Sequence, residues 1–139
     1  MLTGVLFVGL LGTAAELVLI EHYEDRNQLV PLIALGLGLA ALGWDTAAQG
    51  RASRRALRLA MLGLVASSVA GMVLHYRSNE EFQRELDPAL TGRQLVLATL
   101  RSQSPPSLAP GMLGLLGALG WIATHGRTDA DGSRQETNR

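Results

Sequence analysis

The sequence contains no cysteine, no lysine and few aromatic residues, which make up 4% of the chain. The absence of cysteine excludes disulfides, thiolate metal sites and cysteine nucleophiles. The 12 basic residues, all arginine, are balanced by 12 acidic residues. The net charge is therefore zero, so no excess of positive charge attracts nucleic acid, and we expect no nucleic-acid partner.

Charged residues make up only 17% of the chain, and four long apolar segments contain almost none of them. A bilayer core about 30 Å thick is crossed by about 20 apolar residues in a helix. The four segments that approach this length are Leu2–Ile20, Leu29–Ala48, Leu57–Tyr76 and Leu108–Thr124. They are apolar nearly all round, whereas the helices of a soluble bundle would each have a polar face. The sequence therefore predicts an all-α integral membrane four-helix bundle over residues 1–126.

The first segment is expected to remain as a span, because it lacks the basic start and the small-residue cleavage site of a signal peptide. Arginine in short loops favours the cytoplasm. The link between the second and third spans holds Arg51, Arg54, Arg55 and Arg58. We therefore expect both termini in the cytoplasm, with residues 127–139 as a disordered tail.

The outer loop, residues 77–107, is long enough to hold structure of its own. Its first part is expected to continue the helix of the third span and to stop before Asp87-Pro88. The stretch "GRQLVLATLRSQ" has an apolar centre and an arginine near each end. It is too short to span, so we expect a short helix lying in the membrane interface. The stretch "SPPSLAPG" is expected to be an extended linker that starts the fourth span, with Pro110 in its first turn.

Small residues allow helices to approach closely in lipid. In the third span, Gly63, Ser67 and Gly71 recur at steps of four and lead to His75, which predicts a packing seam that ends at the histidine. In the first span, Gly9 and Gly12 share an arc with Glu16, so we expect Glu16 to face another helix. The four glycines of the fourth span recur at steps of three and are expected to wrap around that helix.

A carboxylate inside an apolar span is costly, so Glu16 is a candidate proton or cation site, although a protonated, hydrogen-bonded glutamate is an alternative. His22 and His75 each precede a tyrosine, each ends an outward-running span and each lies beside acidic residues. Imidazole with carboxylates suits a divalent metal such as zinc or manganese. The candidate metal ligands are Glu16, Glu21, His22, His75, Glu81 and Glu85. A hydrogen-bonded surface network is the alternative, and the cofactor stays unknown.

Three quoted stretches, "EHYEDRNQLVPL", "LHYRSNEEFQRELDP" and "PSLAPGMLGLLG", resemble small bacterial four-span membrane proteins of uncharacterised function. The resemblance covers the chain up to about Gly126. It implies the four-span fold and a place in the bacterial inner (plasma) membrane, and it implies no mechanism. The shared motif residues are His22, Tyr23, Glu24, Asp25, His75, Tyr76, Asn79, Glu81, Phe82, Glu85 and Pro88.

The sequence has no glycine-rich phosphate loop and no nucleophile elbow, so we expect no enzymatic activity. The leading hypothesis is a small membrane protein whose outward His/acid cluster binds a cation, a proton or a partner. A structural or assembly subunit of a larger membrane complex is the alternative, with a protein partner or a homo-oligomer in the bilayer. A haem-binding electron carrier, with His22 and His75 as axial ligands, is a further alternative.

Overall fold

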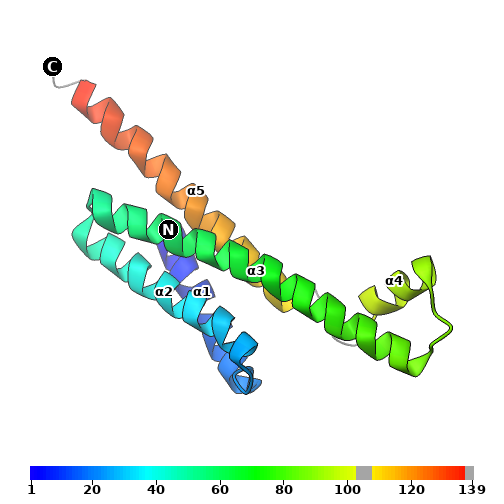
Figure 1. Ribbon diagram of the computed structural model, residues 1–139. Coiled ribbons are helices and arrows are strands. Elements are labelled where there is room, and N and C mark those ends of the chain that lie inside the picture. The colour runs from blue at the N-terminus through cyan, green and yellow to red at the C-terminus, as the bar shows by residue number, and fades with distance from the viewer. Residues whose placement is uncertain (103–107, 137–139) are drawn as a thin grey trace.

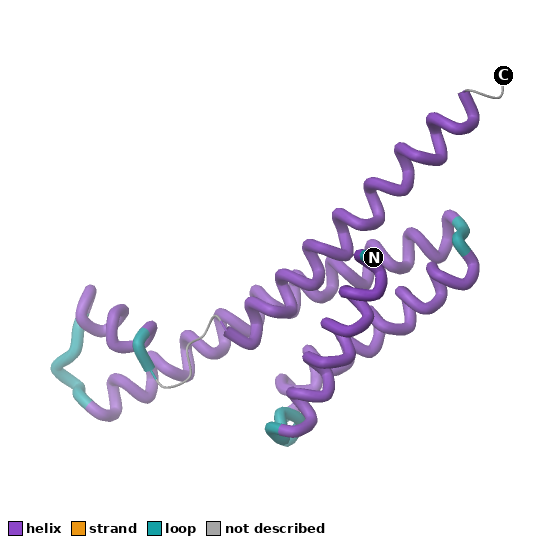
Figure 2. Tube along the Cα trace, turned by 180° about the vertical axis from the view of Figure 1, so that it is seen from behind, coloured by secondary structure: helices purple, strands orange, loops and turns teal. Residues whose placement is uncertain are grey.

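The computed structural model describes residues 1–102 and 108–136, and all the regular secondary structure in these residues is helical. Figure 1 shows the arrangement of the helices, and Figure 2 shows it from behind. The helices are α1 (Leu2–Leu19), α2 (Arg26–Ala48), α3 (Arg51–Leu86), α4 (Gly92–Leu100) and α5 (Leu108–Glu136). The predicted all-α class is confirmed.

Three of the described helices, α1, α2 and α3, are long and apolar enough to cross a membrane, judged by length and composition alone. Their mean hydropathies over the most apolar stretch are 2.0, 1.6 and 1.9. α5 does not meet this measure over its described residues. It begins at the predicted Leu108, but its backbone stays helical to Glu136 instead of ending near Thr124. Residues 137–139 of the expected tail and residues 104–107 of the expected linker lie outside the described residues.

The core lies where four of the helices meet. α1 packs against α2 and α5, and α3 packs against α2 and α5, so these contacts form a ring. The buried side chains within it are Leu6, Leu10, Leu17, Leu35, Ala41, Leu42, Leu57, Met61, Leu64, Leu113 and Leu116. The turn between α1 and α2 and the turn between α2 and α3 lie at opposite ends of these helices (Figure 1). Large apolar side chains also cover the outside, including Leu19 at 83% and Val8 at 70% exposure, which is compatible with a membrane protein.

Glycines bring α5 into close contact with α3. A Cβ atom at Gly117 would lie 2.7 Å from the backbone oxygen of Met61, and one at Gly114 would lie 2.7 Å from Oγ of Ser68. A Cβ at Gly120 would collide with the side chain of Met61. The expectation that these glycines wrap around the helix is therefore wrong for three of the four, because 114, 117 and 120 all face α3. Gly111 has open space at its Cβ position.

The predicted seam on α3 is present only in part. Ser67 is buried, and Pro110 of α5 packs on Gly71, whose Cβ would lie 3.3 Å from Cγ of that proline. Gly63 is exposed and has no atom within 4 Å of its Cβ position. The predicted seam therefore does not extend to Gly63, because each step of four residues turns the position by about 40° around the helix.

α3 extends well beyond its neighbours. Its 36 residues span about 54 Å, at about 1.5 Å per residue. It ends at Leu86, directly before Asp87-Pro88, as predicted. α4 packs against this extension and buries Leu95 and Thr99 (Figure 1). The predicted short helix between α3 and α5 is therefore present, over Gly92–Leu100.

We expect Gly117→Ala to destabilise the fold by about 1–3 kcal/mol, because the new methyl group meets α3 backbone that cannot yield. The matched control is Gly111→Ala on the same helix, where the added methyl group meets open space. That variant should be neutral or more stable by up to about 1 kcal/mol, because alanine favours the helix. Denaturant unfolding of the purified protein measures both changes, and equal effects would contradict the proposed contact.

Candidate functional site

His22 is positioned by the way in which α1 ends. Glu21 adopts a left-handed conformation with φ of 56°, and the N–H of His22 donates to the carbonyl of Leu17 at 2.9 Å. The N–H of Glu21 donates to the carbonyl of Val18 at 3.1 Å. These two bonds form a Schellman motif, which closes the end of a helix and reverses the chain direction. The motif holds the histidine at the turn instead of letting α1 continue outward.

His75 lies on α3, one helical turn beyond Gly71. The contact between Gly71 and Pro110 places the start of α5 directly beside this turn. His75 and His22 are both half-buried, and their rings stack with centroids 6.2 Å apart and planes at 20° to each other. The two histidines therefore meet, although α1 and α3 are not among the helix pairs that pack extensively.

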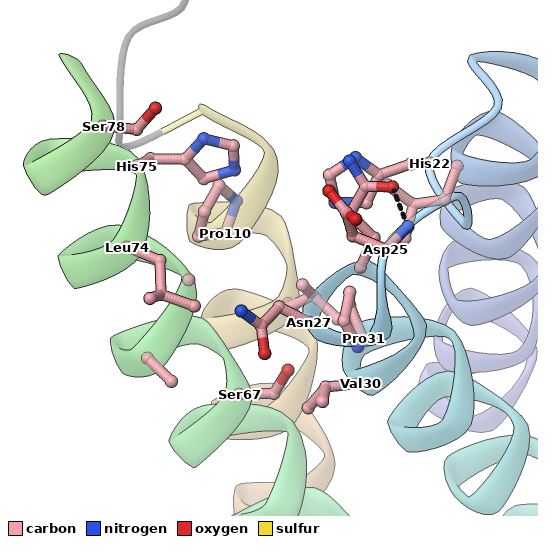
Figure 3. Close-up of a pocket in the computed structure, with 15 residues that line it drawn as sticks. His22, Asp25, Asn27, Val30, Pro31, Ser67, Leu74, His75, Ser78 and Pro110 are labelled. Carbon is pink, nitrogen blue, oxygen red and sulfur yellow. Dashed lines mark hydrogen bonds between the residues drawn. The ribbon is translucent and has the colours of Figure 1, made fainter.

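The histidine pair lines a cavity of about 490 Å³. Leu17, Pro110 and Leu113 contribute apolar walls from α1 and α5, and all three are buried. Figure 3 shows His75 and Ser78 on α3 across the cavity from His22 and Asp25. The remaining lining residues are Asn27, Gln28, Val30, Pro31, Ser67, Ala70, Gly71 and Leu74. The cavity thus joins polar groups to an apolar interior, as small-molecule sites do.

The start of α2 supplies polar groups that the sequence analysis did not assign to the site. The N–H of Asp25 donates to Oε1 of Gln28 at 3.1 Å, shown by the dashed line in Figure 3. This bond is one half of a capping box, and an aspartate followed three residues later by glutamine signals it in sequence. Pro31 has no N–H to donate to the carbonyl of Asn27 one turn earlier, and both residues line the cavity.

Burial lowers the pKa of His22 from its usual value of 6.5, and the nearby His75 lowers the pKa further. The neutral imidazole is therefore the form that the fold favours. Because the folded pKa is below the unfolded one, the unfolded chain takes up this proton first as the pH falls. The contribution of His22 therefore lowers the free energy of unfolding as the pH drops below 6.5, and this decrease levels off below the folded pKa.

Of the predicted metal ligands, only the two histidines come together. Glu16, Glu21, Glu81 and Glu85 are exposed and do not line the cavity. Glu81 and Glu85 lie about 9 Å and 15 Å further along α3 than His75, at about 1.5 Å per residue. Among the residues whose side chains the structure describes, 1–102 and 110–125, no group of three or more His, Asp or Glu could hold a metal ion.

Glu16 is exposed, and the predicted contact with another helix is not found within the described chain. It lies about 100° around α1 from the buried Leu17, at about 100° per residue. Gly9 contacts Leu116 of α5, but Gly12 has nothing within 4 Å of its Cβ position. Gly9 therefore lies at the edge of the packed face of α1, whereas Gly12 and Glu16 lie outside it.

The opposite end of the helices holds a second group of buried polar side chains. Asp45 at the end of α2 is 2% exposed, and Oγ of Ser53 donates to its Oδ1 at 3.1 Å. Arg58 donates from Nε to Oγ1 of Thr124 at 3.2 Å and from Nη2 to the carbonyl of Thr124 at 3.1 Å. These bonds tie α2 to α3 and α3 to α5. In the sequence, Arg58 gave only a topology signal, and its role in packing could not be predicted from it.

We expect substitution of His75 by glutamine to raise the pKa of His22 toward 6.5, because the neighbouring charge is removed while much of the burial stays. An NMR titration of the imidazole signals measures this pKa. The matched control is His125→Gln, because His125 contacts Trp121, several helical turns along α5 from the cavity. A His22 pKa that does not respond to the loss of His75 would contradict the pairing.

We expect Thr124→Val to destabilise the fold by about 1–3 kcal/mol, because it keeps the shape but removes the acceptor for Nε of Arg58. The matched control is Thr46→Val, whose exposed hydroxyl donates only to the carbonyl of Gly43. That change should cost much less, because water replaces the lost bond. Denaturant unfolding measures both, and equal losses would show that the buried bond contributes nothing specific.

Comparison with known proteins gives no relative from which a function could be transferred. No protein family, no curated protein and no solved structure matches this chain.

Proposed function

We propose that the chain is a four-span integral membrane protein of the bacterial inner membrane. Its spans are α1, α2, α3 and the first part of α5, and both termini are cytoplasmic. The ring of helix contacts supports this arrangement, as do the apolar outer surfaces of α1, α2 and α3. The four arginines at the start of α3 support the orientation, which places the histidine cavity at the outer end.

α4 is proposed to lie in the outer membrane interface. Its exposed face presents Val96, Leu97 and Leu100, while Leu95 and Thr99 face inward. Arg93 and Arg101 flank this apolar face. Basic residues beside an apolar strip suit a helix at the boundary between lipid headgroups and acyl chains.

The function proposed for the outer cavity is reversible proton binding by the His22–His75 pair. One observation carries it: the two imidazole rings, from distant parts of the chain, stack 6.2 Å apart at a cavity. Histidine is the side chain whose ordinary pKa lies in the physiological range. Among the residues whose side chains are described, no third His, Asp or Glu completes a metal site with this pair, which favours the proton over a divalent cation.

Protonation would change the cavity by electrostatic repulsion. Two imidazolium rings at 6.2 Å repel by about 1–3 kcal/mol, between the dielectric of water and that of a protein surface. Asp25 also lines the cavity and partly offsets this repulsion when both rings are charged. His22 belongs to a turn held by backbone bonds, whereas His75 belongs to a long helix. The turn and α3 are therefore pushed apart when the pair becomes doubly charged.

The role is proposed to be non-enzymatic. Ser67 and Ser78 line the same cavity as the histidines, but within the described residues neither serine hydroxyl bonds to an imidazole. A serine nucleophile needs such a bond to its base. The cavity is thus equipped to bind rather than to carry out acyl transfer.

The test measures the distance between the turn and α3 at two pH values. The chain has no cysteine, so Tyr23→Cys and Phe82→Cys give two unique, exposed sites for spin labels. In liposomes, the distance between the labels should increase as the pH falls from about 8 to about 5, because proton uptake by the pair would add positive charge between the turn and α3. The control carries the same labels with His22→Gln and His75→Gln, and its distance should not change. An unchanged distance in the parent chain would overturn the proposal.

Calorimetry with zinc and manganese tests the cation alternative. Tight binding that is lost in the His22→Ala/His75→Ala variant would replace the proton with a metal ion. A Soret band in the absorption spectrum of protein from its native membrane would instead favour the haem carrier.

A further inference from the structure

α1 has an exposed face that its own chain leaves uncovered. Its buried side chains Leu6, Leu10 and Leu17 form one line toward α2 and α5. Gly12 lies about 120–160° around the helix from this line, at about 100° per residue. It is exposed and has nothing within 4 Å of its Cβ position. The face centred on Gly12 thus points away from the packed helices.

The small and aliphatic residues on this face recur with a heptad spacing. Val5, Gly12 and Leu19 are seven residues apart, and Val8 and Ala15 fall three residues after the first two. All five are exposed, with Val5 at 52%, Val8 at 70% and Leu19 at 83%. Alternating steps of three and four are the pattern by which two helices pack along a common seam. The left-handed crossing that results is the commonest one among membrane helices.

Glu16 stands beside this seam, about 40° around the helix from Gly12. It is exposed and makes no hydrogen bond or ion pair with any described residue. A carboxyl group within a span is costly, and such groups pair with one another or with backbone carbonyls. The uncovered face of α1 therefore carries a polar group that requires a partner.

A second copy of the chain meets this requirement without any further component. Copies insert into the membrane with the same orientation, so a two-fold axis between them is normal to the bilayer. Each residue of α1 then lies at the same depth as its symmetry mate, and the seam faces itself. Gly12 allows the two backbones to approach, and each Glu16 carboxyl can bond its mate or a carbonyl that the glycine leaves open.

We propose that α1 forms the interface of a parallel homodimer, with Val5, Val8, Gly12, Ala15 and Leu19 along the contact and Glu16 hydrogen-bonded across it. The inference rests on the four-span placement and is independent of the histidine pair.

Disulfide crosslinking in native membranes tests the interface directly, since the chain has no cysteine. Val8→Cys should give a crosslinked dimer. Ile33→Cys on α2, which is 59% exposed, is the matched control and should give only a collisional background. Adding Gly12→Leu to Val8→Cys should lower the crosslinked fraction about tenfold, the effect of losing about 1.4 kcal/mol of association free energy. Gly36→Leu is the control for that change, because Gly36 is also exposed with nothing within 4 Å.

Glu16 is tested in the same assay. Glu16→Leu should reduce the crosslink of Val8→Cys, whereas Glu16→Gln, which keeps a hydrogen-bonding group, should retain most of it. Equal crosslinking at positions 8 and 33, in a chain that stays in the membrane after alkaline carbonate treatment, would overturn the α1 interface alone. Release of the chain by carbonate would overturn the four-span placement and, with it, this inference.

Discussion

Gly114, Gly117 and Gly120 set the distance between α3 and α5, since a side chain at any of them would meet Ser68, Val65 or Met61. Glycines let two helix backbones approach closely, which increases the van der Waals contacts between the helices. The two polar regions depend on this contact. At one end of the contact between α3 and α5, Pro110 packs on Gly71, one turn before His75. At the other end, Thr124 lies within hydrogen-bond distance of Arg58.

The histidine pair depends on a second constraint, which is local to one turn. The Schellman bonds at the end of α1 and the capping bond at the start of α2 use backbone groups that would otherwise lack partners. Together they fix a short connection between two antiparallel helices. His22 lies in this connection, so its position relative to α3 is set by backbone geometry rather than by packing of its own side chain.

The positions of the helices could be predicted from the sequence because apolar runs and Asp87-Pro88 are local signals, whereas the continuation of α5 to Glu136 has no apolar signal. The sequence left open whether His22 and His75 meet, because this depends on how the turn after α1 packs beside α3. The exposed position of Glu16 could not be predicted. The packing of α2 and α5 decides which face of α1 is buried, and the sequence of α1 alone does not show this. The same holds for Gly63 and for the bonds of Arg58, whose partner Thr124 is 66 residues away. The proposed spans, their orientation and the ligand stay predictions.

α3 passes without interruption from Arg51, through His75, to Leu86. A continuous helix transmits tilt and rotation along its whole length, since its hydrogen-bond ladder resists bending at any one turn. Ser53 near one end holds Asp45 of α2, and the other end holds α4. A tilt of α3 at any one point would therefore displace both of its ends, the arginine-rich end bonded to α2 and the end that carries α4.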